Sequence, residues 1–438
     1  MILRTNDFNN GEKPHVKDSS APFLTEIGID SPARVFAADT DLFLSAGADV
    51  NAQRKSNRAA VFSAIALKLC EFGQKTLIVS KTDDELTGDA RSAFRKKLAV
   101  SDFRFEEKDS DTASEESSAD KIFSRKNEKP SFNPYTEEDY LRLRAVAEEN
   151  DDIRSVFVIG GSEEISLGKR LATEFGIPLA VFITRPDGDS FLSPYFTVRR
   201  EGRVDYIPSA APSLAFFDAA QTLSERDMRR GAGFIAKALM TLPETDYLGG
   251  DYSEELLGVI KDCLFTDFTK ITVQNKTLLF TSLLRLSALR SKGEYPLITP
   301  ADGLMETLGL FGVDGKDYAY TCSRLIAEIY SDVLSEPELV LTPPPDTLGR
   351  FRRLSSLGAN TRGNLGNDRF LNFVFPVFAA KIERLVKSLS LFENCCLTDP
   401  IPLSSRELRD AICASAEIFG QHGLLRDLFL AGYLPANP

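Results

Sequence analysis

The chain has 438 residues, of which 43% are hydrophobic and 26% are charged, and this composition is typical of a globular protein with roughly two to four domains. The formal net charge of −12 argues against nucleic acids and anionic membrane surfaces as partners, because both attract basic patches. No apolar run approaches the ~20 residues of a membrane span, residues 1–7 do not resemble a signal peptide, and the six cysteines are scattered. We therefore expect reduced thiols and a cytoplasmic location.

Histidine is scarce in this chain. The two histidines are His15, in a polar N-terminal stretch, and His422, near the C-terminus. Acid–base enzymes and zinc enzymes usually place an imidazole near their centre. The chain therefore either does without such a site or is not an enzyme of that kind.

The first half of the chain alternates between strand and helix patterns. Residues 1–30 are polar and irregular and predict a flexible arm, and residues 31–220 predict an α/β domain. Helical spacing and caps indicate three helices, at 57–72 after Ser56, at 83–98, and from Thr136 to 150 with Asp139 completing a capping box. Short apolar runs predict strands at 34–37, 76–80, 102–105, 156–159, 179–184, 204–207 and 214–218.

A polar insert interrupts this domain at residues 107–134. The segment lacks the apolar residues that would offset the entropy lost on ordering. It is either a solvated surface loop, which we favour, or a regulatory or binding insert.

Beyond residue 220 the pattern becomes helical, which predicts a helical domain over 221–438. The candidate N-caps are Ser224, Ser253 and Ser405. Apolar residues recur at helical spacing over 271–289, 318–334 and 370–391. Pro376 should kink the last of these helices.

The stretch 156–194 organises the chain. Four apolar residues run into Gly160-Gly161-Ser162, after which a helix begins with Glu163 and Glu164. Glycines let the backbone turn tightly at the start of a helix, where free N–H groups can hold a phosphate. A second strand follows and leads into a polar loop over 187–194.

The order of these motifs resembles the dehydroquinate synthase-like superfamily, which includes the iron-containing alcohol dehydrogenases, and the likeness is greatest to glycerol-1-phosphate dehydrogenases. In that family the glycine turn is Gly-Gly-Gly-Ser followed by an Asp and a Lys, and the polar loop contains Asn-Asp-Gly-x-x-Ser-Pro. This chain keeps Lys169, Thr184 and the Asp189…Ser193-Pro194 spacing, and the segment 406–428 is similar to the family's tail. The resemblance spans roughly residues 34–434 and implies a Rossmann-like parallel sheet domain followed by an all-α domain.

The resemblance also implies a site. Members of the family bind NAD(P) in the cleft between the domains and hold zinc or iron with one Asp and two His. Asp189 matches the metal-binding Asp, and Lys169 and Asp189 are the candidate catalytic residues. The residues that match cofactor-binding positions are Gly160, Gly161, Ser162, Thr184 and Arg185, of which Arg185 is as readily a surface ion pair.

The metal histidines of the family have no counterpart here. The segment where the first should lie, 296–305, contains none, and Asp314 stands where the second should lie. Asp189, Asp302 and Asp314 could form an all-oxygen site suited to Mg²⁺ or Mn²⁺. We favour the simpler interpretation, in which Asp302 and Asp314 are turn and cap residues before glycines.

The cofactor turn departs from the family pattern as well. Ser162 replaces the third glycine, Ser166 replaces the helix Asp, and Phe234 stands where relatives have an acid. Glu163 and Glu164 satisfy the helix dipole themselves, and a carboxylate ~5 Å from a pyrophosphate costs about 3 kcal/mol. We therefore expect weak binding of NAD or NADP and no zinc or iron, and interpret Lys169 as a solvated residue unless it is catalytic.

Two functions follow from these patterns. The favoured one is a degenerate family member, a pseudoenzyme without metal-dependent dehydrogenase activity that acts as a binding, regulatory or partner protein. It would assemble with itself or with an active paralogue. The alternative is an active NAD(P)-dependent oxidoreductase that acts on a polyol phosphate such as glycerol 1-phosphate.

Overall fold

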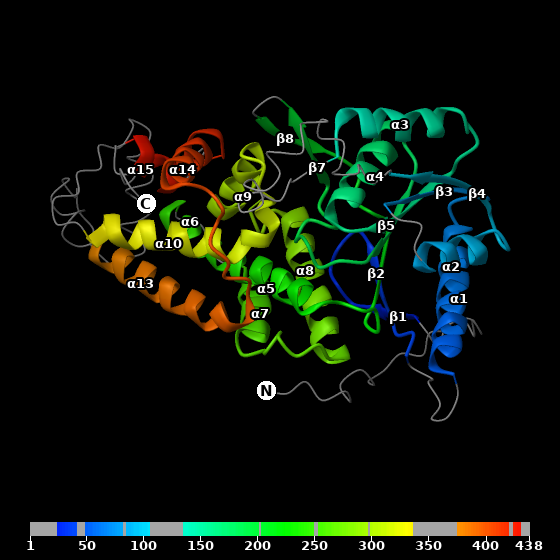
Figure 1. The fold of residues 1–438 in the computed structure, drawn as a ribbon, viewed down its shortest axis with the longest axis horizontal. Coiled ribbons are helices and arrows are strands. Elements are labelled where there is room, and N and C mark those ends of the chain that lie inside the picture. Colours follow the sequence, from blue (N-terminus) through cyan, green and yellow to red (C-terminus); the bar gives the residue numbers. More distant parts are fainter. Residues whose placement is uncertain are drawn as a thin grey trace, which may run out of the picture.

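The computed structural model describes residues 24–41, 49–81, 85–105, 135–200, 203–248, 253–296, 298–335, 375–419 and 424–430. His15, His422 and the polar insert 107–134 lie outside these described residues. In Figure 1 the strands gather toward one end of the molecule, and the helices of the second half of the chain form the other end.

A seven-stranded sheet forms the first region, in the order β1-β2-β9-β6-β5-β3-β4. All neighbouring strands are parallel except β1 and β2. The bounds are β1 Leu24–Ile27, β2 Arg34–Ala38, β3 Lys75–Ser80, β4 Ala99–Arg104, β5 Ser155–Gly160, β6 Leu179–Ile183 and β9 Leu214–Asp218. Strand β1 lies within residues 1–30, so the expectation of an irregular arm is wrong for this part.

Helices cover both faces of the sheet. Helices α1 (Val50–Leu69) and α2 (Glu85–Phe94) share one hydrophobic core with the sheet, and α3 (Glu137–Glu148) and α4 (Ser162–Phe175) pack into the other core. The capping box predicted at Thr136 is present. The prediction of Ser56 as an N-cap is wrong, because Asp49 caps α1. The first turns of α1 are largely exposed and carry no apolar pattern that would have indicated this earlier start.

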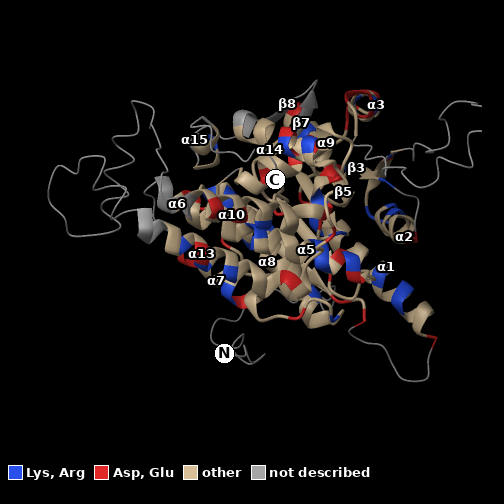
Figure 2. Ribbon diagram, turned by 60° about the vertical axis from the view of Figure 1, so that its left-hand side comes forward, with Lys and Arg blue, Asp and Glu red and all other residues tan. Residues whose placement is uncertain are grey.

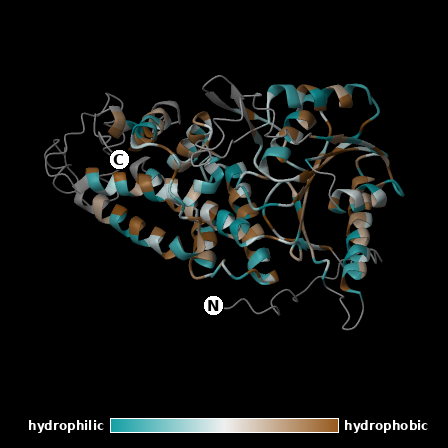
Figure 3. Ribbon diagram, viewed as in Figure 1, coloured by the Kyte–Doolittle hydropathy of each residue, from teal (hydrophilic) through white to brown (hydrophobic). Residues whose placement is uncertain are grey.

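The central strands are buried on both sides, which is the pattern of a parallel sheet between helices. Along β5, Val156 and Val158 belong to one core, and Phe157 and Ile159 belong to the other. This alternation follows from the two-residue period of a strand. Figure 3 shows the strands as the most continuously hydrophobic segments in view.

The elements after Asp218 are helices, as predicted, so the expected fold class is confirmed. They are α5 Glu225–Lys237, α6 Thr241–Leu248, α7 Glu254–Leu264, α8 Val273–Lys292, α9 Pro300–Leu310, α10 Ala319–Ser335, α13 Phe375–Phe392, α14 Ser405–Phe419 and α15 Leu424–Leu430. Short 3₁₀ turns are η2 Ala238–Met240, η3 Gly315–Tyr318 and η5 Glu393–Cys395. A separate antiparallel hairpin, β7 Tyr195–Arg200 with β8 Arg203–Pro208, precedes β9.

Of the three N-caps predicted in the helical region, two are confirmed. Ser224 and Ser253 cap α5 and α7 as predicted. At α14 the cap is Ser404 rather than Ser405, because the Ser404 hydroxyl accepts the Glu407 N–H at 3.3 Å. Pro376 lies in the first turn of α13, where a missing N–H costs nothing, so the predicted kink is wrong.

One core runs from the sheet into the helical region. Phe217 of β9 stacks on Phe280 of α8, with ring centroids 5.1 Å apart. The loop after β6 is held to α8 as well, since Leu192 N–H donates to Ser287 Oγ at 2.6 Å. The carboxyl ends of the parallel strands therefore face α5, α8 and α9, where open α/β sheets commonly bind ligands.

The outer helices carry both signs of charge. Figure 2 shows acidic and basic residues interspersed along α13, and Lys387 and Glu383 form one such pair at 2.8 Å. Among the described residues, no helix combines the length and the apolar character that crossing a membrane requires.

Candidate functional site

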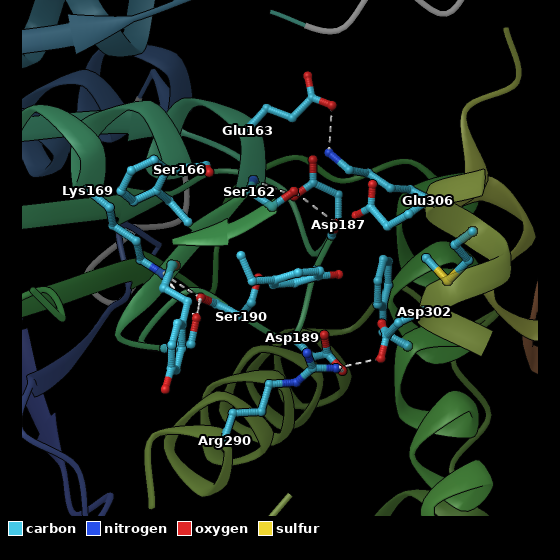
Figure 4. Close-up of a pocket in the computed structure, with 18 of the residues that line it drawn as sticks. Ser162, Glu163, Ser166, Lys169, Asp187, Asp189, Ser190, Arg290, Asp302 and Glu306 are labelled. Carbon is cyan, nitrogen blue, oxygen red and sulfur yellow. Dashed lines mark hydrogen bonds and ion pairs between the residues drawn. The ribbon is translucent and has the colours of Figure 1, made fainter. Parts of the chain in front are cut away.

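A cavity of about 140 Å³ lies at the carboxyl edge of the sheet, between the start of α4, the loop from β6 to β7, and helices α8 and α9. Figure 4 shows its labelled residues converging from these elements, with Ser162 and Lys169 on one side and Arg290 and Asp302 on the other. Three of the candidate site residues, Ser162, Lys169 and Asp189, line it. The other candidates, Gly160, Gly161, Thr184 and Arg185, lie outside this lining.

The backbone amides of the glycine turn bind the chain's own carboxylates. Gly161 N–H donates to Glu164 Oε2 at 2.8 Å, and Ser162 N–H donates to Asp187 Oδ1 at 2.8 Å. These amides open helix α4, where an anion is most stable. The two carboxylates thus stand where a phosphate would bind.

The carboxylates are themselves held in place. Arg185 donates to Glu164 Oε2 at 2.9 Å and lies 3.7 Å from Asp187, and Tyr135 donates to Glu164 Oε1 at 2.8 Å. Burial alone would lower the pKa of Arg185, but Asp187 and Glu164 outweigh burial and raise it above its ordinary value. Arg185 thus forms an ion pair, as one of its two interpretations proposed, but with two buried carboxylates rather than on the surface.

The glycines serve this internal packing. A Cβ on Gly160 would meet the Cβ of Glu164 at 2.7 Å, and one on Gly161 would meet Arg185 Nε at 2.9 Å and the Asp187 carboxylate. The space that a side chain would take is filled by protein atoms. The pyrophosphate of NAD(P) does not fit the turn in this arrangement.

One expectation about the turn is wrong. Glu164 does occupy the anion position, but Glu163 does not, because Glu163 pairs with Lys316 of η3 at 3.0 Å. The second occupant is Asp187, which arrives from the following loop. Thr184 contributes a backbone bond, from its N–H to Gly160 O at 3.0 Å.

Lys169 is buried, so the interpretation as a solvated surface residue is wrong. Its Nζ donates to Ser190 O at 2.6 Å, Ser193 Oγ at 3.3 Å and Tyr195 O at 3.3 Å. These three acceptors are uncharged. Burial, with a smaller contribution from the positive charge of Arg290, lowers the pKa of Lys169 to about 7.

Asp189 belongs to a group of four buried charges, which we call the four-charge cluster: Asp189, Lys237, Arg290 and Asp302. Lys237 Nζ lies 3.0 Å from Asp189 Oδ2 and also contacts Asp302. Arg290 Nη2 lies 3.1 Å from Asp189 Oδ2 and 3.0 Å from Asp302 Oδ2. Tyr295 Oη donates to Asp189 Oδ2 at 2.9 Å.

The positive and negative charges of the four-charge cluster are equal in number and are buried together. Burial would raise the pKa of the Asp302 carboxyl, but Arg290 and Lys237 outweigh it and hold this pKa well below its usual range. Burial and the Asp189 carboxylate raise the pKa of the Tyr295 phenol. Tyr295 therefore remains a hydrogen-bond donor, and the two carboxylates meet two cations.

A metal ion does not fit this cluster. Asp189 Oδ2 already contacts Lys237, Arg290 and Tyr295, and a divalent cation there would stand beside two positive charges. Within the described part of the chain, no group of three or more His, Cys, Asp or Glu residues could hold a metal ion. The metal implied by the resemblance therefore lacks a place at Asp189.

The two other aspartates have the cap roles that we favoured. Asp314 caps η3 by accepting the Lys316 N–H at 3.1 Å. Asp302 completes a capping box by accepting the Thr299 N–H at 2.8 Å. The ion pairs of Asp302 with Lys237 and Arg290 were not anticipated.

The sequence contained a signal for one residue that we missed. Lys237 is a lone charge in the otherwise apolar run 234–240, and a buried charge requires a partner. Arg290 gave no comparable signal, because the stretch of α8 before it also contains Arg285 and Ser287. The partners of these residues lie far away in sequence, so their identity could not be deduced.

The structure is similar to solved iron-containing alcohol dehydrogenases over most of its length. One crystal structure of an iron containing alcohol dehydrogenase gives a TM-score of 0.55 at 11% identity, with 92% of this chain and 97% of that chain covered. The one from Thermotoga maritima gives 0.54 at 10% identity, with 85% and 92% covered. The one from Thermococcus thioreducens gives 0.55 at 10% identity, with 92% and 98% covered.

No protein-family model matches the sequence, and no curated protein does. The structural similarity nevertheless shows that the chain has the fold of iron-containing alcohol dehydrogenases, which confirms the expected dehydroquinate synthase-like fold.

Proposed function

We propose that this protein is a pseudoenzyme with a dehydrogenase fold, whose sequence motifs resemble those of glycerol-1-phosphate dehydrogenases. It acts in the cytoplasm as a binding, regulatory or partner protein and lacks metal-dependent dehydrogenase activity. The observation that carries the proposal is the occupied glycine turn, where Gly161 and Ser162 donate to Glu164 and Asp187.

Charge explains why this occupation opposes a dinucleotide. A phosphate charge ~4 Å from a carboxylate is disfavoured by about 4 kcal/mol at an effective dielectric of ~20, which is about a thousandfold in affinity. To avoid this cost, Glu164 and Asp187 would have to leave their amides. Glu164 would then also lose its bonds to Arg185 and Tyr135.

The remaining cavity supports a binding role for a small polar molecule. Its volume of about 140 Å³ is below the roughly 300–1,000 Å³ of common ligand pockets. Lys169, Ser190 and Glu306 are among the polar residues that line it. A ligand of a few heavy atoms suits this space better than a dinucleotide. Self-assembly or pairing with an active paralogue would allow such a ligand to regulate a partner.

One observation favours the alternative, an active NAD(P)-dependent oxidoreductase on a polyol phosphate such as glycerol 1-phosphate. The polar cavity lies beside Lys169, whose pKa of about 7 suits a proton-transfer group. This alternative requires the carboxylates to leave the glycine turn and requires a route to hydride transfer without the metal at Asp189.

Isothermal titration calorimetry with NADH and with NADPH tests the proposal. We expect no saturable binding up to about 1 mM, the upper end of ordinary KM values. Asp187→Ala frees the Ser162 amide and should tighten binding at least about tenfold, which is about 1.4 kcal/mol. Asp152→Ala is the matched control, because it removes an exposed carboxylate that pairs with Lys75 elsewhere.

The opposite results are equally clear. Micromolar NADH or NADPH binding by the wild-type protein, with oxidation of glycerol 1-phosphate by NAD⁺ or NADP⁺ in an assay supplemented with zinc or iron, would overturn the pseudoenzyme and establish the alternative. Equal cofactor binding by Asp187→Ala and Asp152→Ala would show that Asp187 does not block the turn.

A further inference from the structure

Two buried carboxylates of this protein converge on one point. Asp189 and Asp302 both contact Lys237 Nζ, and both contact the same guanidinium nitrogen of Arg290, at 3.1 and 3.0 Å. Figure 4 shows Asp189, Arg290 and Asp302 meeting at the base of the cavity. A shared position between two carboxylates is where a bridging cation is most stable.

The four charges come from four different elements. Asp189 lies in the loop between β6 and β7, Lys237 ends α5, Arg290 lies in α8, and Asp302 lies in the first turn of α9. The cluster therefore ties the loop that leaves the sheet to three helices of the second region. Each of the four side chains is at most 11% exposed.

The side chains are fixed by neighbours as well as by one another. Asp302 accepts from Thr299 N–H and Oγ1, both at 2.8 Å. The Arg290 guanidinium lies 4.5 Å from the Tyr295 ring centroid, and Lys237 Nζ lies 4.9 Å from the Phe234 ring centroid. The carboxylates are thus held in one geometry that does not depend on the two cations alone.

The net charge of the four-charge cluster decides whether it can accept a metal ion. The two carboxylates carry two negative charges, and Lys237 and Arg290 together carry the same positive charge as one divalent ion. Adding a metal ion would leave an uncompensated double positive charge in a buried volume, which is strongly unfavourable. Removing one protein cation would reverse this and leave an uncompensated negative charge.

We propose that Lys237 and Arg290 replace a divalent cation between Asp189 and Asp302, and that this internal pair of cations holds the loop after β6 against α5, α8 and α9. The Lys237 ammonium and the Arg290 guanidinium both bridge the two carboxylates and together supply the two positive charges. The proposal concerns the metal position and does not depend on whether a cofactor binds the glycine turn.

Gain of metal binding tests this inference. Lys237→Ala removes the bridging ammonium and should let the carboxylates bind one Mn²⁺ per chain, at least about tenfold tighter than in the wild-type protein. Mn²⁺ is measured by electron paramagnetic resonance and by metal analysis after gel filtration. Adding Asp189→Asn to Lys237→Ala should abolish the gain.

Lys276→Ala is the matched control. Lys276 is also a buried lysine, but its Nζ donates to the carbonyl of Gln221 at 2.8 Å instead of bridging two carboxylates. Its removal should not produce metal binding. Equal gains in the two lysine variants would show nonspecific binding and overturn the proposal.

Two further results would contradict the proposal. One is stoichiometric Mn²⁺, Zn²⁺ or Fe²⁺ in the wild-type protein, and the other is a folded Lys237→Ala variant that binds no more Mn²⁺ than the wild type. If Lys237→Ala does not fold alone, Mn²⁺ in the refolding buffer should restore its circular dichroism spectrum, but not that of the double variant with Asp189→Asn. Failure of Mn²⁺ to restore the spectrum would also contradict it.

Discussion

The glycine turn and the four-charge cluster use the same principle with opposite signs. At the turn, residues 160–162 present backbone amides that attract an anion, and the chain supplies Glu164 and Asp187. At the cluster, Asp189 and Asp302 attract a cation, and the chain supplies Lys237 and Arg290. In both places the protein's own side chains provide the opposite charge.

The glycine turn and the four-charge cluster differ in how much free energy is needed to separate their paired charges. The Arg185 side chain at the turn is 36% exposed, so water can stabilise it if the carboxylates move. The Lys237 side chain in the cluster is fully buried. Opening the turn separates Glu164 and Asp187 from a partly exposed cation, whereas opening the cluster separates charges that are all in the low-dielectric interior, so the cluster is the more stable closure.

The largest predicted effect lies in the cluster. Arg290→Met should lower the free energy of unfolding by about 3–5 kcal/mol, because it leaves two buried carboxylates with one cation. Urea denaturation measures the loss. Lys276→Met, which removes one hydrogen bond to a carbonyl, should cost about 1 kcal/mol. Equal losses in the two variants would remove the distinction between the cluster and an ordinary buried cation.

Removal of a carboxylate from the turn should have the next effect. Glu164→Ala deletes the acceptor for Gly161 N–H, Arg185 and Tyr135, and should cost about 2–3 kcal/mol. The loss should be smaller than that of Arg290→Met because Arg185 reaches solvent. Denaturation of both variants under one condition compares them, and a larger loss for Glu164→Ala would reverse our ranking of the two closures.

Lys169 lines the same cavity as Ser162 and Asp189, and its titration should be visible in the free energy of unfolding. Its pKa is about 7 when folded and about 10.4 in an unfolded chain, so between these values the unfolded chain binds one more proton. The free energy of unfolding of the wild type, relative to Lys169→Met, should therefore rise by about 1.4 kcal/mol per pH unit from about pH 7 to 10. Denaturation at several pH values measures this slope, and a flat difference would show that Lys169 stays charged.

The smallest predicted effect lies at the rim of the cavity. Lys316 and Glu163 pair at 3.0 Å with side chains 17% and 27% exposed. Lys316→Ala should cost about 1 kcal/mol or less, because the ion pair is partly exposed and solvent replaces part of its interaction. Thermal unfolding detects the change. If Lys316→Ala lost as much free energy of unfolding as Glu164→Ala, Glu163 would also be needed to hold the glycine turn in its observed structure.

The fold could be predicted from the sequence because apolar runs and N-caps depend on residues that are close together in the chain. Apolar runs predicted β3, β5 and β9, and the N-caps Thr136 and Ser224 predicted where α3 and α5 begin. Errors arose where local signals are weak. The polar start of α1 has no apolar period, and β1 is an edge strand with little burial.

The site was less accessible because its partners are distant in sequence. Asp189 meets Lys237, 48 positions away, and Arg290, 101 positions away. No periodicity or spacing rule relates these residues. The sequence could therefore predict that the two metal histidines of the resembled family have no counterpart here, but it could not indicate what stood between Asp189 and Asp302.

The most direct test is a crystal structure of the wild-type protein grown with millimolar NADH and Zn²⁺. The account predicts Glu164 and Asp187 on the amides of the glycine turn and the Lys237 ammonium between Asp189 and Asp302. Electron density for a pyrophosphate at the turn, or for a metal ion between the two aspartates, would contradict it.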